Sequence, residues 1–351
     1  MLPRIKTIDL KLENKKENFW ISAELKEEIS KTIKERKQSL IFLNKRGYAP
    51  VVICKSCGFS KVCSNCDFPL VLHKNYACEN SNFLVCHYCN YKEIFENFCK
   101  KCNSKDKFLT IGPGVEKIYE EVKEIFPNAK ICLLSSDIAK KENDWSNTLN
   151  SIVENSVDII IGTQIISKGH HFPFLKTVGI LNIDNLLNSF DMRASEKAYQ
   201  TITQVAGRAG REGTQGKVII QTFQPDHPVI KAIKNRKKDE FLEWELNQRK
   251  INCHPPFSNL ISLIISGKNE NTVQSSSSDL SDLIKKKFRD IEIFGPAPAL
   301  LRKIRGNYRW RILIKISKNF LTQKNLKEFL VNIPTKKEVN LKIDVDPINF
   351  F

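Results

Sequence analysis

The sequence lacks a long apolar run, a secretion signal and an internal repeat. None of its 351 residues belongs to an apolar stretch of about 18 or more, so we expect no membrane-spanning helix. The first residues, Met-Leu-Pro-Arg-Ile-Lys, contain no apolar core of a signal peptide, which favours a cytoplasmic location. Because disulfide bonds are uncommon in the cytoplasm, the 11 cysteines need another explanation.

Acidic residues are fewer than basic ones. The chain has 39 Asp and Glu against 56 Lys and Arg, which gives a formal net charge of +17 at pH 7. A protein this basic most often binds a polyanion such as nucleic acid. The sequence is also rich in Lys, Asn and Ile, which an AT-rich genome enriches for reasons unrelated to binding. The charge alone therefore favours nucleic acid without deciding the matter.

The cysteines, in contrast, are concentrated in four Cys-x-x-Cys pairs. These pairs are Cys54 with Cys57, Cys63 with Cys66, Cys86 with Cys89, and Cys99 with Cys102. Two thiolates three residues apart can bind one zinc ion from a tight turn, and zinc takes four such ligands. A redox-active Cys-x-x-Cys occurs singly, beside the start of a helix. The sequence therefore predicts two zinc ions in closed, structural sites.

The pairing of these motifs follows from the segment between Cys66 and Cys86. Short apolar runs at 68–73 and 82–85 are separated by polar residues, which predicts a β-hairpin. A hairpin brings its ends together, so we expect an inner site of Cys63, Cys66, Cys86 and Cys89 and an outer site of Cys54, Cys57, Cys99 and Cys102. Interleaved pairing would require the chain to cross itself. His73 and His87 are alternative ligands.

Outside this segment, strand and helix patterns alternate. We expect helices at 23–37, with Ser22 as N-cap, and at 115–126, 144–154 and 195–209; strands are expected at 39–43, 130–134, 157–161, 177–182 and 217–222. This alternation predicts an α/β fold with a parallel sheet covered by helices on both faces. After a helix at 238–250, the order changes to strand 259–266, helix 271–287, strands 290–294 and 308–316, helix 323–332 and strand 338–345, which is ferredoxin-like.

Two motifs of the α/β part suit phosphate chemistry. In the stretch Gln-Val-Ala-Gly-Arg-Ala-Gly-Arg at 204–211, Arg208 and Arg211 are expected to share a helix face and to bind a triphosphate. Residues 161–164 follow a strand, where α/β sheets bind ligands, and 167–171 form a donor-rich loop suited to a phosphate backbone. The alternatives are a surface helix with solvated arginines and an ordinary polar turn.

These motifs together resemble the family of primosomal protein N′ (PriA), the replication-restart helicase. The resemblance rests on the four cysteine pairs and on residues 40–50, 161–164, 168–170, 191–196, 204–211, 295–299 and 308–311. It implies a superfamily 2 DNA helicase that moves 3′ to 5′, binds forks and single strands, and helps to reload the replicative helicase. Primosome proteins and the single-stranded-DNA-binding protein are the implied partners.

The resemblance also assigns domains and residues. It implies a second RecA-like helicase lobe at 1–53 and 103–224, a zinc-binding insertion at 54–102 and a C-terminal DNA-binding domain at 225–351. The residues implied to reach the ATP γ-phosphate are Gln204, Arg208 and Arg211. Those implied to couple the DNA backbone to the nucleotide are Thr163, Gln164, Lys168 and Gly169.

No Gly-x4-Gly-Lys-Ser/Thr motif and no Asp-Glu-x-His motif occurs in the sequence. The chain therefore lacks the first helicase lobe, and we expect ATP and Mg²⁺ to bind only if that lobe is supplied. Alone, the chain is not expected to hydrolyse ATP. The alternative function is a non-catalytic, zinc- and DNA-binding scaffold of the primosome.

A last basic stretch, 301–320, contains no acidic residue. Arg309, Arg311 and Lys315 share strand parity and are expected on one face of a strand, while Trp310, Ile312 and Ile314 pack inward. The basic residues expected in a loop before this strand are Arg302, Lys303 and Arg305. We predict that Arg302, Arg305, Arg309 and Arg311 bind DNA phosphates, the alternative being a solvated charged face.

Overall fold

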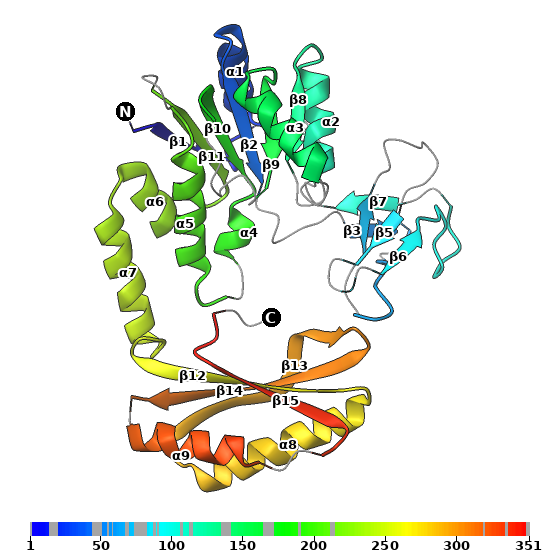
Figure 1. Cartoon of the computed structure of the whole chain (residues 1–351), viewed down its shortest axis with the longest axis vertical. Helices are drawn as coiled ribbons and strands as arrows, with labels where there is room; N and C mark the ends of the chain where they lie inside the picture. The colour runs from blue at the N-terminus through cyan, green and yellow to red at the C-terminus, as the bar shows by residue number, and fades with distance from the viewer. Residues whose placement is uncertain are drawn as a thin grey trace. The chain divides into compact units, whose positions relative to one another are not determined.

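The structure is a computed structural model, and most of its elements are labelled in Figure 1. It describes residues 2–13, 20–43, 51–54, 56–57, 59–66, 70–73, 83–86, 89, 91–105, 108–111, 115–134, 142–163, 172–188, 191–210, 215–318, 320–333 and 336–348. The chain divides into two compact units, Met1–Ala49 with Gly112–Glu245, and Pro50–Ile111 with Leu246–Phe351.

The first unit contains a six-stranded sheet in the order β1-β11-β10-β2-β9-β8. All neighbouring strands of this sheet run parallel. The strands are β1 (Arg4–Asp9), β2 (Gln38–Leu43), β8 (Ile131–Leu134), β9 (Ile159–Gly162), β10 (Leu175–Leu181) and β11 (Lys217–Thr222). The α/β fold with a parallel sheet that the sequence predicts is confirmed.

Helices cover both faces of this sheet. Leu25 and Ile29 of α1 (Ala23–Lys34) and Ile118 of α2 (Val115–Ile125) pack with buried residues of one sheet face. A second core joins the other face to helices α3 (Glu142–Val153), α5 (Ala194–Ala206) and α6 (Pro228–Asn235). The short helix α4 (Asp184–Leu187) and helix α6 were not expected from the sequence, whereas α7 (Lys238–Ile251) was.

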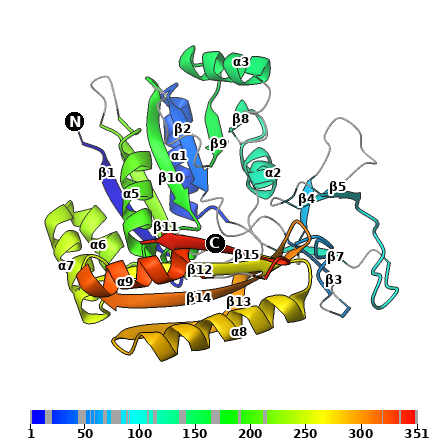
Figure 2. The ribbon, with the colours of Figure 1, turned by 60° about the horizontal axis from the view of Figure 1, so that its bottom comes forward.

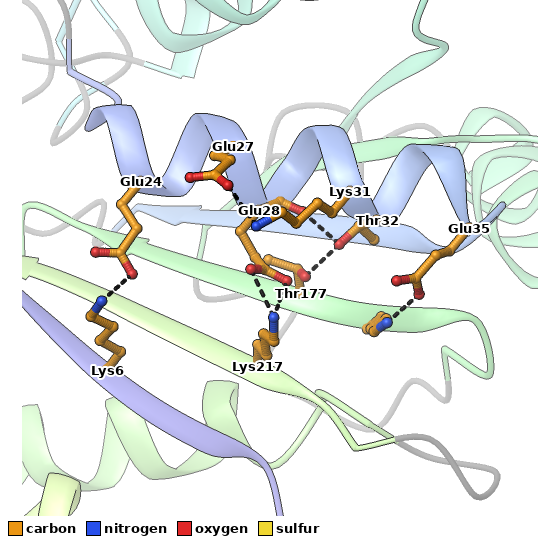
Figure 3. Close-up of polar contacts among 10 residues, drawn as sticks. Lys6, Glu24, Glu27, Glu28, Lys31, Thr32, Glu35, Thr177 and Lys217 are labelled. Atoms are coloured by element: carbon orange, nitrogen blue, oxygen red, sulfur yellow. Dashed lines mark hydrogen bonds and ion pairs between the residues drawn. The ribbon is translucent and has the colours of Figure 1, made fainter.

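Polar contacts fix α1 over the sheet (Figure 3). The hydroxyl of Ser22 caps the helix by accepting a hydrogen bond from the N–H of Leu25 at 3.3 Å. The contacts of the helix with the strands are Glu24 with Lys6 at 2.7 Å, Glu28 with Lys217 at 2.8 Å, and Thr32 with Thr177 at 2.6 Å. Only the threonine pair is fully buried, so the exposed ion pairs contribute little to stability by comparison.

The second unit begins with a five-stranded sheet in the order β6-β5-β4-β3-β7. Its strands are β3 (Val51–Cys54), β4 (Val71–His73), β5 (Phe83–Val85), β6 (Lys92–Ile94) and β7 (Phe108–Ile111). Strands β4 and β5 form the antiparallel hairpin that the sequence predicts. Strands β3 and β7 pair from Val51 opposite Ile111 to Cys54 opposite Phe108, so the two ends of the cysteine-rich segment lie side by side.

The rest of the second unit has the ferredoxin-like order of strands, β13-β14-β12-β15. Its elements are β12 (Ser258–Gly267), α8 (Glu270–Lys287), β13 (Ile291–Ile304), β14 (Asn307–Ser317), α9 (Phe320–Val331) and β15 (Val339–Val345). Helices α8 and α9 pack on one face of this sheet (Figure 2). Strand β13 is longer than predicted, so Arg302 and Lys303 lie on a strand and only Arg305 lies in the turn.

Within the described ranges, no helix is long and apolar enough to cross a membrane.

The contact between α1 and β10 gives a test of the packing. A Cβ atom added to Gly179 would lie 2.7 Å from Cδ2 of the fully buried Leu25. We expect Leu25→Ala to lower the free energy of unfolding by about 2–5 kcal/mol and Gly179→Ala by about 1–3 kcal/mol. The double variant should lose less than the sum, because the new methyl group partly fills the new cavity. Denaturant unfolding measures all three, and strictly additive losses would contradict this packing.

Candidate metal centres and nucleic-acid interface

The eight cysteines of the Cys-x-x-Cys pairs lie in two groups of four. Within each group the Sγ atoms all lie within 4.8 Å of one another. The groups are Cys54, Cys57, Cys99 and Cys102, called the outer tetrad here, and Cys63, Cys66, Cys86 and Cys89, the inner tetrad. This is the grouping that the hairpin argument predicts, because β4 and β5 bring the second and third pairs together.

The sulfur spacing fits a tetrahedral ion. The Sγ–Sγ distances are 3.6 Å for Cys54–Cys102, 3.7 Å for Cys57–Cys99 and 3.6 Å for Cys63–Cys89. Four sulfurs at about 2.3 Å from a zinc ion would be about 3.8 Å apart, whereas a disulfide needs about 2.05 Å. Both tetrads could therefore hold a metal ion, and zinc matches the four-thiolate donor set.

In the outer tetrad, a hydroxyl group supports two of the sulfurs. Ser104 Oγ lies 3.2 Å from Cys54 Sγ and 3.1 Å from Cys102 Sγ. This hydroxyl is the main cause that lowers the pKa of Cys54 to about 6, and it also lowers the pKa of Cys102. Ser104 was not singled out from the sequence, although its place two residues after Cys102 was the available signal.

In the inner tetrad, three of the four cysteines are buried. Burial raises the pKa of Cys63 to about 12. Burial alone would also raise the pKa of Cys89, but the N–H of Tyr91 and the neighbouring thiols lower it to about 7. Hydrogen bonds among the thiols thus raise the pKa of Cys63 and lower that of Cys89. A divalent cation removes this difference and lets all four ligands be thiolates.

Strand β14 presents arginines on one face and apolar residues on the other. Ile312, Ile314 and Ile316 are fully buried against α8 and α9, while Arg309 and Arg311 are half-buried on the opposite face. Burial lowers the pKa of Arg309, and the charge of Arg311 lowers it further. No carboxylate of the described residues lies within ion-pair distance of Arg309. The predicted alternation is present, and it places two like charges side by side.

Three further basic residues of this stretch, Arg302, Lys303 and Lys315, have partners within the chain. Arg302 forms a two-pronged ion pair with Glu270, with hydrogen bonds of 2.8 and 2.7 Å. Lys315 lies 3.1 Å from Glu292. The ammonium group of Lys303 lies 5.0 Å from the centre of the Tyr308 ring. Arg302 would therefore have to give up an ion pair in order to bind a phosphate.

The predicted nucleotide-side residues are described only in part. Thr163 is buried directly after β9, where its N–H donates to the carbonyl of Leu134 at 3.3 Å. Gln204 is exposed on α5, but α5 ends at Ala206, so Arg208 lies in the turn beyond the helix rather than on its face. That corrects the predicted helix of 195–209. The remaining predicted residues, Gln164, Lys168, Gly169 and Arg211, lie outside the described residues.

Glycines hold the turn after α5 against the sheet. Gly210 has a φ of 72°, and its N–H donates to the carbonyl of Leu175 at 2.9 Å. A Cβ atom added to Gly216 would lie 2.5 Å from the carbonyl carbon of Ala209. These glycines therefore allow close backbone packing beside Arg208.

Comparison with known proteins identifies the family. The family model described as the C-terminal domain of primosomal protein N matches residues 252–348, and the helicase conserved C-terminal domain matches residues 85–213. The chain is 39% identical over 350 residues to the replication restart protein PriA of Rickettsia conorii, which covers 100% of this chain and 53% of that protein. Over its whole length the chain is similar to the C-terminal portion of PriA.

Other PriA proteins agree with this assignment. The replication restart protein PriA of Bacillus subtilis is 30% identical over 352 residues, covering 99% of this chain and 43% of that protein. The chain thus spans about half the length of the PriA relatives that it matches, and the two family models identify its C-terminal portion. Among solved structures, yeast Dbp5 bound to RNA and ADP BeF3 matches with a TM-score of 0.34 at 12% identity, covering 71% of this chain and 45% of that chain.

Proposed function

We propose that the chain provides the second motor lobe, a two-zinc insertion and a DNA-binding C-terminal domain for replication restart at abandoned forks. The observation that carries this proposal is the parallel sheet interrupted, between β2 and α2, by a segment with two cysteine tetrads. The similarity to PriA over the whole length of the chain supports it. The domains are those assigned above, 1–53 with 103–224, 54–102 and 225–351.

Each tetrad binds one zinc ion in this proposal. Four thiolates leave no position for water or substrate, so the two ions stabilise the insertion and do not activate a reactant. Ser104 in the outer tetrad and the N–H of Tyr91 in the inner one stabilise the negative charge on the sulfurs. The chain's own residues therefore orient the ligands before metal arrives.

The DNA-binding face is proposed to centre on Arg309 and Arg311. Both guanidinium groups are half removed from water, and the charge of Arg311 repels that of Arg309. A phosphate group placed between them would relieve this repulsion and accept forked hydrogen bonds. Phosphates carry no base identity, so the expected ligand is forked or single-stranded DNA of any sequence. Arg305, whose side chain is exposed, would add to this face, and Arg302 would add less.

The nucleotide side of the motor is proposed to need a first helicase lobe. Arg208 and Arg211, with Gln204, would stabilise charge on the γ-phosphate that such a lobe holds. Thr163, Gln164, Lys168 and Gly169 would couple nucleotide binding to the DNA backbone.

Metal analysis tests the zinc sites. The purified chain should contain two zinc ions, and Cys63→Ser should contain about one, because the outer tetrad is separate from the inner one. Cys253→Ser, which changes an exposed cysteine outside both tetrads, should retain two. Fewer than two ions in the unmodified chain, or loss of both ions from Cys63→Ser, would contradict separate sites.

Salt-dependent binding tests the DNA face. Arg309→Ala combined with Arg311→Ala should weaken binding equally on unrelated DNA sequences, and it should flatten the slope of log K against log salt by about one to two units. The control is Lys324→Ala with Lys327→Ala, which removes two exposed charges from α9 on the other side of the sheet. Fluorescence anisotropy with forked DNA measures both. An unchanged slope in a folded, zinc-loaded Arg309 and Arg311 variant would refute the proposed face.

An ATPase assay tests the division of the motor. The chain alone should show no DNA-stimulated ATP hydrolysis, because its sequence contains no phosphate-binding loop motif. Hydrolysis that Arg211→Ala abolishes would reveal a complete nucleotide site within this chain and overturn the proposal.

A further inference from the structure

The turn that joins β13 to β14 has an unusual residue in a strained conformation. Ile304 pairs with Asn307, so Arg305 and Gly306 are the two central residues of the turn. Their φ angles are 50° and 79°, as in a type I′ turn. Glycine and asparagine adopt this left-handed region readily, whereas an arginine does so at a cost. A conformation of this kind persists where the surroundings hold it in place.

The surroundings of this turn are the first Cys-x-x-Cys pair of the inner tetrad. The N–H groups of the two central residues have no partner within such a turn, because only its flanking residues bond to each other. Here both N–H groups donate to residues 64–66 of the same unit. The hydrogen bonds are Gly306 N–H to Asn65 O at 2.9 Å, Arg305 N–H to Cys66 Sγ at 3.5 Å, and Lys303 Nζ to Ser64 O at 3.1 Å.

The bond to Cys66 differs from the backbone bonds to four other sulfurs of the tetrads. Each of those four sulfurs accepts from an N–H group two residues further along the chain. The pairs are Cys57 with Phe59, Cys63 with Asn65, Cys89 with Tyr91, and Cys102 with Ser104. Cys66 instead accepts from Arg305, 239 residues away. The C-terminal domain therefore supplies the backbone N–H donor to Cys66. The four sulfurs named above each receive such a donor from a residue within or close to their own Cys-x-x-Cys pair.

We propose that the tip of the β13–β14 hairpin is an outer part of the inner metal site. A donor to a ligating sulfur stabilises the thiolate and orients it, so metal at the inner tetrad and docking of the hairpin strengthen each other. The inner tetrad would then lock the C-terminal domain to the cysteine-rich segment, while the outer tetrad would not. This inference rests on the zinc binding proposed above.

Hydrogen exchange of the full chain tests the coupling. In the zinc-loaded protein the amides of Arg305 and Gly306 should exchange slowly, although turn amides are usually unprotected. Cys63→Ser, which removes the inner metal, should speed their exchange by about 10-fold or more. The matched variant Cys57→Ser, which removes the outer metal, should leave it unchanged, and the amides of Ile312 and Ile314 should stay protected in every variant. Equal exchange at the tip in Cys63→Ser and the unmodified chain would overturn the inference.

Zinc release provides the reciprocal test. Arg305→Pro lacks the N–H group and cannot adopt a positive φ, whereas Arg305→Gly keeps the N–H group and removes the strain. Transfer of the inner zinc to a chelator should be about 10-fold or more faster from Arg305→Pro than from Arg305→Gly, with release of the outer zinc alike in both. Equal rates would refute the coupling. A protein without zinc would refute the proposed metal sites themselves, whereas two zinc ions with a metal-independent tip would refute only this inference.

Discussion

The close approach of four sulfurs, which occurs in each of two tetrads, is the constraint on which the cysteine-rich segment depends. Its strands contain three or four residues each, and its apolar core beyond the cysteines centres on Val52, Leu70 and Leu84. Burying one such side chain contributes roughly 1.5–3 kcal/mol. A structural zinc site contributes roughly 10–16 kcal/mol, and it also neutralises thiolates that otherwise keep one another protonated. With a zinc ion in each tetrad, as proposed above, the metal would outweigh this core, and the ligands would fix the positions of the short strands.

The antiparallel pair of β3 and β7 explains how the parallel sheet accommodates the insertion. Strand β2 pairs with β9 and β10, both of which follow the insertion in sequence. The chain must therefore return from the insertion to complete the sheet. Because Val51 pairs with Ile111, the insertion begins and ends at neighbouring positions, and the entropy of closing this long loop is offset by its own antiparallel pairing and ligands. The insertion therefore does not disturb the strand pairing of the parallel sheet.

Local patterns made much of the structure predictable, and long-range contacts did not. Helix α1 was predicted because Leu25 and Ile29 follow helical spacing after a serine cap, and the tetrads were predicted because one hairpin fixes their pairing. The sequence predicted that this strand ends at 294, but β13 continues to Ile304; it lies at the sheet edge, where the prolines of Gly-Pro-Ala-Pro are tolerated. The ion pair of Arg302 with Glu270 and the bond from Arg305 to Cys66 join distant segments, and no periodicity encodes them.

One hairpin connects the proposed metal and DNA sites. Its tip donates to the inner tetrad through Arg305, and four residues further along β14 the same hairpin carries Arg309. From Gly306 at the tip, three strand residues at about 3.4 Å each separate the turn from Arg309, about 10 Å in all. A strand that is held at its tip and packed along one face is already ordered. It therefore loses little conformational entropy when its other face binds a ligand, which favours binding. The buried isoleucines of β14 and the contact of the tip with the inner tetrad thus both fix the position of the strand that carries Arg309 and Arg311. Neither of them contacts a phosphate.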